Sequence, residues 1–238
     1  AITHGTLLEN QTFKKMIANS ELMKKDTIKR FSLDEKKIEV IYPALETQIF
    51  YPKSLSERAE LKKRFGFPED KVIVSLVTSG NFEKRGLDIF IQAIEKLPDS
   101  IKNKASFRVL GKDENNLYAR PFLTFDPGLS DIENYFNAID LFVLPARIEE
   151  FGRVVLEAMG CGLPVITTDK VGAGELLQEA SARFVTPAGN AEVLTQALAE
   201  LIQKPELRSF LGEINARVAK GHSEEQLYPR FDRVFLDI

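Results

Sequence analysis

Glu149 and Glu157 are the side chains in this sequence best suited to hold a ligand rich in hydroxyl groups. Glu149 lies in an acidic loop after a short apolar run, 141–144, and Glu157 follows seven intervening residues later, about one and a half turns into the next helix. An ionised carboxylate only accepts hydrogen bonds and can take two hydroxyl donors. Two such groups at one crevice would suit a sugar and a ribose. Alternatively, both are ordinary solvated charges, although the apolar residues around Glu157 argue against a wet helix face there.

A basic loop, Lys84-Arg85-Gly86, follows another apolar run, 72–77. In a parallel sheet this loop would share an edge with Glu149, because the carboxyl ends of parallel strands lie together. Fixed cations at that edge could take the charge of a diphosphate leaving group without a metal. Each charge-assisted hydrogen bond contributes roughly 1.5–3 kcal/mol. The alternative is a pair of solvated loop charges.

The helix that carries Glu157 begins at Phe151-Gly152. Glycine has no Cβ, so a ligand can approach the backbone closely at Gly152. The unpaired N–H groups and the positive dipole end of a first helical turn favour an anion, by about 0.3–1 kcal/mol on a surface and up to ~2 kcal/mol when partly buried. Tight packing alone would also explain the glycine.

Strands and helices alternate from Val72 to Val185, which predicts a parallel, doubly wound α/β sheet. The expected strands are 72–77, 106–110, 122–125, 141–144, 164–168 and 182–185, and the expected helices 56–65, 87–97, 131–138, 151–159, 172–177, 191–203, 205–220 and 223–236, the last with a kink at Pro229. Before them, a strand at 14–19, a helix capped by Ser20 and a strand at 37–42 are too little for a domain. We interpret them as the tail end of a preceding one.

Composition excludes several classes of protein. The chain has 238 residues, 44% of them apolar, and a net charge of −3, so its charge gives no case for nucleic acid as a partner. The sequence has a single cysteine, Cys161, so an internal disulfide is excluded, and we expect its thiol to pack in the core. The two histidines, His4 and His222, are isolated, so no metal cluster is predicted. Neither a P-loop nor a Gly-x-Gly-x-x-Gly turn is present, nor is a signal peptide or a long apolar span.

Taken together, these residues resemble a known family. The run EEFGRVVLEAMGCGLPVI, with Glu149-x7-Glu157, resembles the signature of the retaining GT-B glycosyltransferases of family 4, the glycosyl transferases group 1. The Lys84-Arg85-Gly86 loop resembles the phosphate-binding loop of that family, and Asn19-Ser20 with KIEVIYP resembles the end of its N-terminal domain and its crossover. Within the family, the chain looks most similar to the lipopolysaccharide-core glucosyltransferases.

The resemblance implies a GT-B fold, in which two Rossmann-like domains hold the active site between them. Residues 1–49 would be the remnant of the N-terminal, acceptor-binding domain and its linker. Residues 50–222 would be the donor-binding domain, and 223–238 a helix that crosses back. Because most of the acceptor domain is absent, the chain alone is expected to be inactive.

The resemblance also assigns donor-binding roles around the helix start. Glu149 would bind hydroxyls of the donor hexose, and Phe151 and Gly152 would offer backbone N–H groups to sugar or phosphate. Glu157 would hold the ribose hydroxyls, and Val155 would pack beside the nucleoside. Glu149 is the carboxylate expected in the catalytic set.

In the basic loop, the resemblance makes Lys84 and Arg85 the clamp on the diphosphate and part of the catalytic set. Gly80 would allow close approach of the donor, with Asn81 beside it and Gly111 near the base. Two departures from the family pattern stand out. Asn81 occupies the position of a usual arginine, and the stretch from Gly111 to Pro121 is too short for the usual helix.

The implied reaction moves a hexose from a nucleotide-sugar, with UDP favoured, to a glycan or lipid-linked acceptor, in lipopolysaccharide or polysaccharide biosynthesis. Configuration would be retained, and neither a metal nor another cofactor is expected. The implied location is cytoplasmic, with peripheral association of the full-length protein at the inner membrane face left open. Two alternatives remain: a sugar-nucleotide epimerase of similar fold and a non-catalytic GT-B-like module that binds a nucleotide or phosphosugar.

Overall fold

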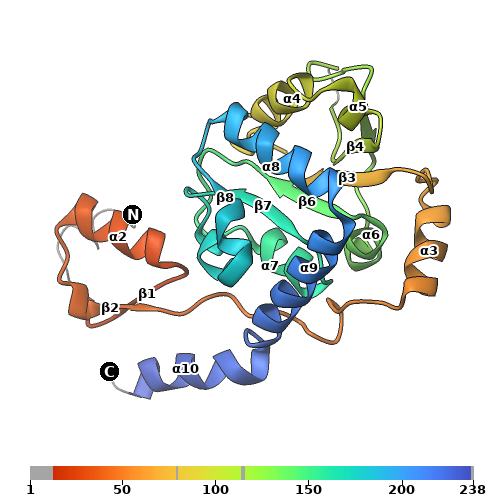
Figure 1. The fold of residues 1–238 in the computed structure, drawn as a ribbon. Helices are drawn as coiled ribbons and strands as arrows, with labels where there is room; N and C mark the ends of the chain where they lie inside the picture. Colours follow the sequence, from red (N-terminus) through yellow and green to blue (C-terminus); the bar gives the residue numbers. More distant parts are fainter. Residues whose placement is uncertain (1–12, 79, 114–115, 237–238) are drawn as a thin grey trace.

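The main body of the molecule is one six-stranded parallel sheet (Figure 1). The computed structural model describes residues 13–78, 80–113 and 116–236, so His4 lies outside the described part. The sheet order is β5-β4-β3-β6-β7-β8, built from β3 (Val72–Val77), β4 (Ala105–Leu110), β5 (Leu123–Asp126), β6 (Leu141–Leu144), β7 (Val165–Thr168) and β8 (Val185–Thr186). The strand order reverses between β3 and β6, the point where such sheets bind ligands.

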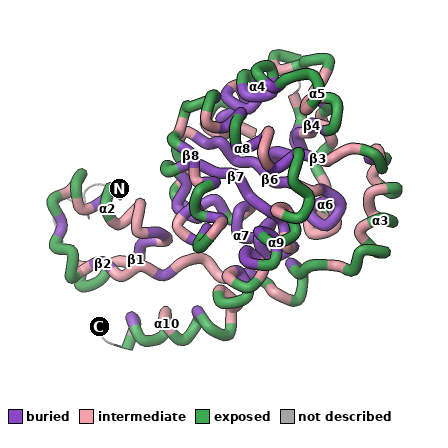
Figure 2. Tube along the Cα trace, viewed as in Figure 1, coloured by how far each residue is buried: buried purple, intermediate pink, exposed green. Residues whose placement is uncertain are grey.

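Strand β3 shows why its sequence is apolar on both sides. Ile73 and Val77 pack in one core and Val74 and Leu76 in the other, as the alternation of side chains along a strand requires. Helices cover both faces of a parallel sheet, so both faces of each central strand are buried. Figure 2 shows the resulting buried centre.

Two layers of helices enclose the sheet (Figure 1). One layer contains α3 (Leu55–Arg64), α6 (Ile132–Ala138), α7 (Arg153–Gly160) and α9 (Pro205–Lys220). The other contains α4 (Leu87–Glu95), α5 (Asp99–Lys102) and α8 (Ala191–Gln203). Cys161, just after α7, is fully buried, and burial raises the pKa of its thiol to about 12. This agrees with a packing role for the only cysteine.

A small unit precedes this lobe. Strands β1 (Met16–Ala18) and β2 (Ile38–Val40) pair in parallel, and α2 (Glu21–Phe31) and the short helix η1 (Glu35–Lys37) lie between them in sequence. Helix α10 (Glu224–Leu236), which contains Pro229, runs back toward this unit (Figure 1). There, Arg230 Nη2 donates to Val40 O at 2.9 Å. We refer to residues 13–40 as the N-terminal unit.

Two expected elements differ in the structure. The strand expected at 182–185 is mostly the 3₁₀ helix η3 (Glu179–Phe184), closed by a bond from Val185 N to Ala182 O, and β8 begins only at Val185. The helix expected at 172–177 is also 3₁₀, η2 (Gly172–Leu176). Short apolar runs fit a strand and a buried turn equally well, which explains the first error.

The loops that follow β3 and β6 touch each other at Gly86. This residue has φ +73°, and a Cβ built on it would overlap the carbonyl oxygen of Pro145. The left-handed backbone and the contact both require glycine. The basic and acidic loops are therefore packed together by the main chain.

Replacing Gly86 by alanine is expected to destabilise the fold far more than replacing Gly189. Gly189 has a similar φ of +77° but nothing within 4 Å of a built Cβ. Gly189→Ala should cost only the left-handed penalty of about 1–2 kcal/mol, whereas Gly86→Ala should cost roughly 3 kcal/mol or more. Urea unfolding of both variants measures the difference. Equal losses would show that the contact with Pro145 is unimportant.

Candidate functional site

The predicted basic and acidic loops meet at the point where the strand order reverses. Arg85 Nη1 and Glu149 Oε2 form an ion pair, and Lys84 Nζ lies 3.9 Å from Glu149 Oε2 and 3.3 Å from Glu150 Oε2. The side chains of Glu149 and Arg85 are only 12% and 23% exposed. A hydrogen bond from its own backbone and the Lys84 ammonium lower the pKa of Glu150. The structure thus brings the predicted cations and Glu149 together.

A cavity of about 360 Å³ opens beside this cluster. Its walls come from two parts of the molecule: the larger lobe, and the N-terminal unit with the connector that joins β2 to α3, residues 41–54. The lining residues are Asn19, Pro43, Arg85, Glu149, Glu150, Phe151, Gly152, Arg153 and Val154. The predicted residues of the helix start therefore face the same space as Arg85.

Arg147 orients the basic loop, a role that the sequence reasoning missed. Its backbone N–H donates to Lys84 O at 2.9 Å, and Nη1 donates to Glu83 O at 2.7 Å. The guanidinium also forms a bidentate pair with Asp88 at 2.7 and 2.6 Å, and the bond from Arg147 lowers the pKa of Asp88. Bidentate pairs fix orientation as well as distance. Arg147 therefore holds the segment that carries Lys84 and Arg85.

Main-chain hydrogen bonds set the path of the acidic loop. Glu149 N donates to Lys170 O at 2.8 Å, and Gly172 N donates to Glu149 O at 3.1 Å. Ala173 N donates to Phe151 O at 2.7 Å. The loop thus runs beside residues 170–173 almost as a strand would, which fixes the backbone of Glu149.

Gly152 is the N-cap of α7 and has φ +87°. A Cβ there would lie 3.0 Å from Val171 Cγ1 and 3.2 Å from Glu149 Cγ. The glycine thus permits both the left-handed turn and the close approach of the Glu149 side chain. Phe151 is buried, with its ring centroid 6.1 Å from that of Tyr42. The residue just before α7 therefore packs against Tyr42 of the connector.

Glu157 lies apart from this cluster. It is not among the described residues that line the cavity, its side chain is 16% exposed, and Arg153 Nε lies 3.9 Å from its Oε1. Burial, with a smaller contribution from Glu46, raises its pKa. Val155 is fully buried in the core, so in this structure it has no exposed surface for the predicted contact with a nucleoside. The ribose and nucleoside roles of these residues stay predictions.

Gly80, Asn81 and Gly111 line a second cavity, of about 620 Å³, rather than the first. Gly111 has φ +156°, and a Cβ there would lie 2.7 Å from Thr78 O. The Phe82 ring packs against the ring of Tyr118, with centroids 5.4 Å apart. None of the described residues between Gly111 and Pro121 is helical. Both aromatic side chains, Phe82 and Tyr118, belong to the wall of this second cavity.

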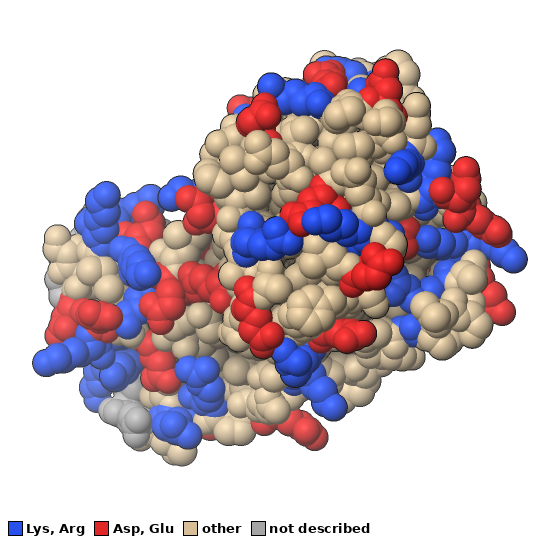
Figure 3. Space-filling model, in the orientation of Figure 1, with Lys and Arg blue, Asp and Glu red and all other residues tan. Residues whose placement is uncertain are grey.

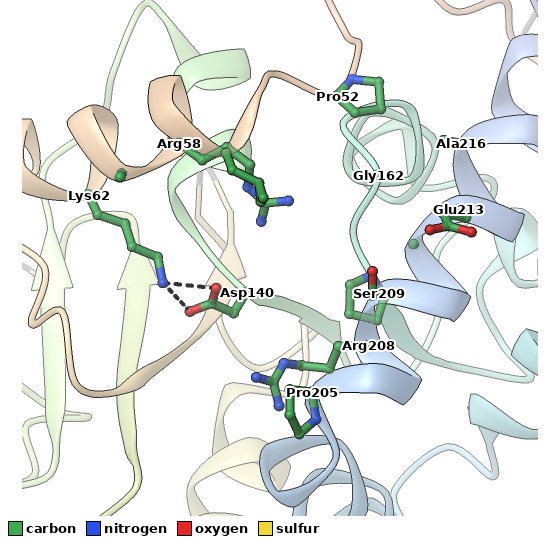
Figure 4. Close-up of a pocket in the computed structure, with 14 residues that line it drawn as sticks. Pro52, Arg58, Lys62, Asp140, Gly162, Pro205, Arg208, Ser209, Glu213 and Ala216 are labelled. Atoms are coloured by element: carbon green, nitrogen blue, oxygen red, sulfur yellow. Dashed lines mark hydrogen bonds and ion pairs between the residues drawn. The ribbon is translucent and has the colours of Figure 1, made fainter.

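A third cavity, about 620 Å³, lies at the opposite end of the strands (Figure 4). Four of its charged side chains, Arg58, Lys62, Asp140 and Arg208, have structural tasks. Arg58 donates to the carbonyl oxygens that end α6, at 3.1 and 3.0 Å, and Arg208 to those near the end of α8, at 2.6 and 3.1 Å. Lys62 pairs with Asp140 at 2.7 Å. We therefore place the candidate site at the carboxyl ends of the strands.

The described residues contain no group of three or more His, Cys, Asp or Glu side chains placed to hold a metal ion. Among the helices described, none has the length and apolar character needed to cross a membrane. Positive and negative side chains alternate over the face seen in Figure 3, which shows no single large field of one sign.

Comparison with known proteins identifies the family. The model of the glycosyl transferases group 1 matches residues 57–218. The chain belongs to this family. WaaG of Escherichia coli, a lipopolysaccharide glucosyltransferase, is 24% identical over 228 residues, covering 90% of this chain and 61% of WaaG. A D-inositol 3-phosphate glycosyltransferase of Thermobifida fusca is 23% identical over 231 residues, covering 89% of this chain and 52% of the relative. The chain thus spans between 52% and 61% of their length.

Solved structures of such glycosyltransferases share the fold. A crystal structure of Anabaena HepE in complex with UDP and glucose matches with a TM-score of 0.81 at 19% identity, covering 96% of this chain and 64% of HepE. The crystal structure of WaaG matches with a TM-score of 0.78 at 22% identity, covering 92% of this chain and 62% of WaaG. The predicted GT-B-type α/β fold is confirmed.

Glu157→Gln is expected to raise the melting temperature of the ligand-free protein at pH 7 by a few degrees. Because burial raises the pKa of Glu157 above 4.5, its charged form disfavours the folded state. Protonated Glu157 favours the folded state. This stabilisation is complete at a pH below the pKa of Glu157 in the unfolded chain, and it is lost as the pH rises through the higher pKa of Glu157 in the folded chain. Glutamine stays neutral at every pH and does not lose it. The difference between variant and wild type should therefore shrink as the pH falls to about 4.5.

Thermal unfolding between pH 4.5 and 7 tests this, with Glu69→Gln as the control because the Glu69 side chain is 71% exposed. A lower melting temperature for Glu157→Gln at pH 7, or a difference that does not depend on pH, would contradict it.

Proposed function

We propose that the chain is the donor-binding part of a retaining glycosyltransferase. The enzyme would transfer a hexose from a nucleotide-sugar, with UDP favoured, to a glycan or lipid-linked acceptor. The observation that carries this proposal is the contact of Lys84 and Arg85 with Glu149 at the strand-order reversal of a group 1 family member. The complex of HepE with UDP and glucose, and the glucosyltransferase activity named for WaaG, support the choice of donor.

Donor binding in this proposal exchanges one set of ion pairs for another. Without a ligand, Arg85 is neutralised by Glu149, and Lys84 lies between Glu149 and Glu150. A diphosphate carries more charge than a carboxylate and suits the planar guanidinium of Arg85. As the cations move to the diphosphate, Glu149 becomes free to accept hydrogen bonds from hexose hydroxyls. Lys84, Arg85 and Glu149 would thus each have a partner in both states, whereas Glu150 would turn to solvent, to which its side chain is already 51% exposed.

The same cations would assist the chemical step. The bond from the anomeric carbon to the diphosphate breaks, and its electron pair stays on the phosphate oxygen. Lys84, Arg85 and the start of α7 would stabilise that charge without a metal. The acceptor hydroxyl attacks from the same face and gives its proton to the departing phosphate, so configuration is retained. The contribution of the protein is position and charge rather than a nucleophile.

The acceptor site belongs to the part of the enzyme that this chain does not cover. The relatives are longer, since the chain spans 61% of WaaG and 52% of the T. fusca enzyme. We propose that residues 50–222 bind the donor, that residues 1–49 continue into an acceptor domain, and that the chain alone does not transfer sugar. A cytoplasmic location at the inner face of the membrane would suit a lipid-linked acceptor.

Isothermal titration calorimetry with UDP in the presence of EDTA tests this function. The wild-type chain should bind UDP without a divalent metal. Lys84→Ala and Glu157→Ala should each weaken binding roughly 10- to 100-fold, the equivalent of one lost charge-assisted hydrogen bond. Lys63→Ala is the control, since the Lys63 side chain is 69% exposed on α3. GDP and ADP in the same assay determine base preference.

A well-folded sample that releases no binding heat with any of the nucleotides would count decisively against the proposal. Equal affinities of Lys84→Ala and wild type would remove the diphosphate clamp from it.

A further inference from the structure

The carboxylate of Glu175 joins the N-terminal unit to the larger lobe. Leu22 N donates to its Oε1 at 2.6 Å, and Glu21 N donates to its Oε2 at 2.9 Å. Tyr42 Oη donates to the same Oε2 at 3.0 Å. All three donors come from the first 42 residues, whereas Glu175 lies in η2 of the larger lobe. One side chain therefore holds the start of α2 and the connector at once.

Ser20 makes a second connection at the same place. Its Oγ donates to Glu150 O at 2.8 Å and accepts from Met23 N at 3.1 Å. A Cβ on Gly172 would lie 2.7 Å from both Cβ and Oγ of Ser20. The start of α2 is thus packed against the acidic loop and against the segment beside it.

The N-terminal unit and the segment that follows it each contribute one residue to the candidate donor cavity. Asn19, of the unit, and Pro43, just after it, line the cavity together with Arg85 and Glu149. Asn19 immediately precedes Ser20, and Pro43 immediately follows Tyr42. The position of Asn19 therefore depends on the bond from Ser20 to Glu150, and the position of Pro43 on the bond from Tyr42 to Glu175.

We propose that Glu175 is a positioning residue for donor binding, which seats the start of α2 on the acidic loop and so completes the cavity. The inference rests on the proposed function, because it takes this cavity as the donor site. Glu175 is not among the described residues that line the cavity, so its effect on the donor is exerted through Ser20, Asn19 and Pro43.

Two observations separate this role from that of an ordinary helix cap. Ser20 already caps α2 from within the local sequence, and Glu175 adds its acceptors from 153 and 154 residues away. Burial and the charge of Glu175 raise the pKa of Tyr42 to about 12. The bond from the Tyr42 hydroxyl, which lies outside α2, is one that a simple cap of α2 would not make.

Glu175→Gln in the full 238-residue chain tests the proposal. Glutamine has nearly the same volume, but its amide NH₂ group would replace one oxygen and face backbone or phenol donors. We expect UDP affinity to fall on the order of tenfold. We also expect faster hydrogen exchange both in residues 20–23 and in the acidic loop, 149–152. The control is Glu57→Gln, since Glu57 also caps a helix, accepting from Ser54 N at 2.8 Å, but far from the cavity.

Wild-type UDP affinity in Glu175→Gln would overturn the proposal, and so would faster exchange confined to α2, because a simple cap would change nothing else. Faster exchange in both segments with weakened UDP binding supports it. If the wild-type chain itself binds no nucleotide, the proposed function fails. The exchange data then still decide the docking role, since an unchanged acidic loop overturns it.

Discussion

The close approach of Gly86 to the Pro145 carbonyl sets the distance between the two loops on which the candidate site is built. A side chain at position 86 would force those loops apart. With the loops in contact, the cations that precede Gly86 reach the carboxylates that follow Pro145. Arg147 reinforces the arrangement from the acidic loop by binding the backbone of the basic one. Main-chain packing therefore sets the geometry of the site, and the charged side chains pair with each other because the two loops are already in contact.

The charges of the site are arranged in pairs that water reaches only partly. Unpaired buried charges are costly, so Arg85 without Glu149, or the reverse, would lower stability. Glu157 is a contrasting case: burial raises its pKa, and its nearest described cation, Arg153, lies 3.9 Å away. A buried carboxylate with so weak an ion pair lowers the stability of the fold. Residues that lower stability in this way are expected mainly at functional positions.

Local sequence patterns were sufficient to predict the fold and the meeting of the basic and acidic loops, but not the residues that hold those loops or the walls of the cavity. Apolar runs and cap residues such as Ser20 locate most elements, and the shared edge of parallel strands predicts that Lys84 lies near Glu149. The pairing of Arg147 with Asp88, 59 residues apart, has no local signature. The reach of Glu175 to α2 across more than 150 residues has none either. Helical spacing likewise could not reveal that the cavity beside Glu149 excludes Glu157, because the cavity walls come from segments distant in sequence.

The main-chain bonds that pair the acidic loop with residues 170–173 have an evolutionary consequence. They involve no side chain of the loop, so its path does not depend on which residues occupy its outward positions. Two of these outward residues are Ile148, which is 53% exposed, and Glu150, whose side chain is 51% exposed. Glu150 lines the cavity, so an exchange there would alter the cavity wall while the backbone of Glu149 stayed in place. Such a loop can change its outward side chains in small steps without losing the fold that supports it.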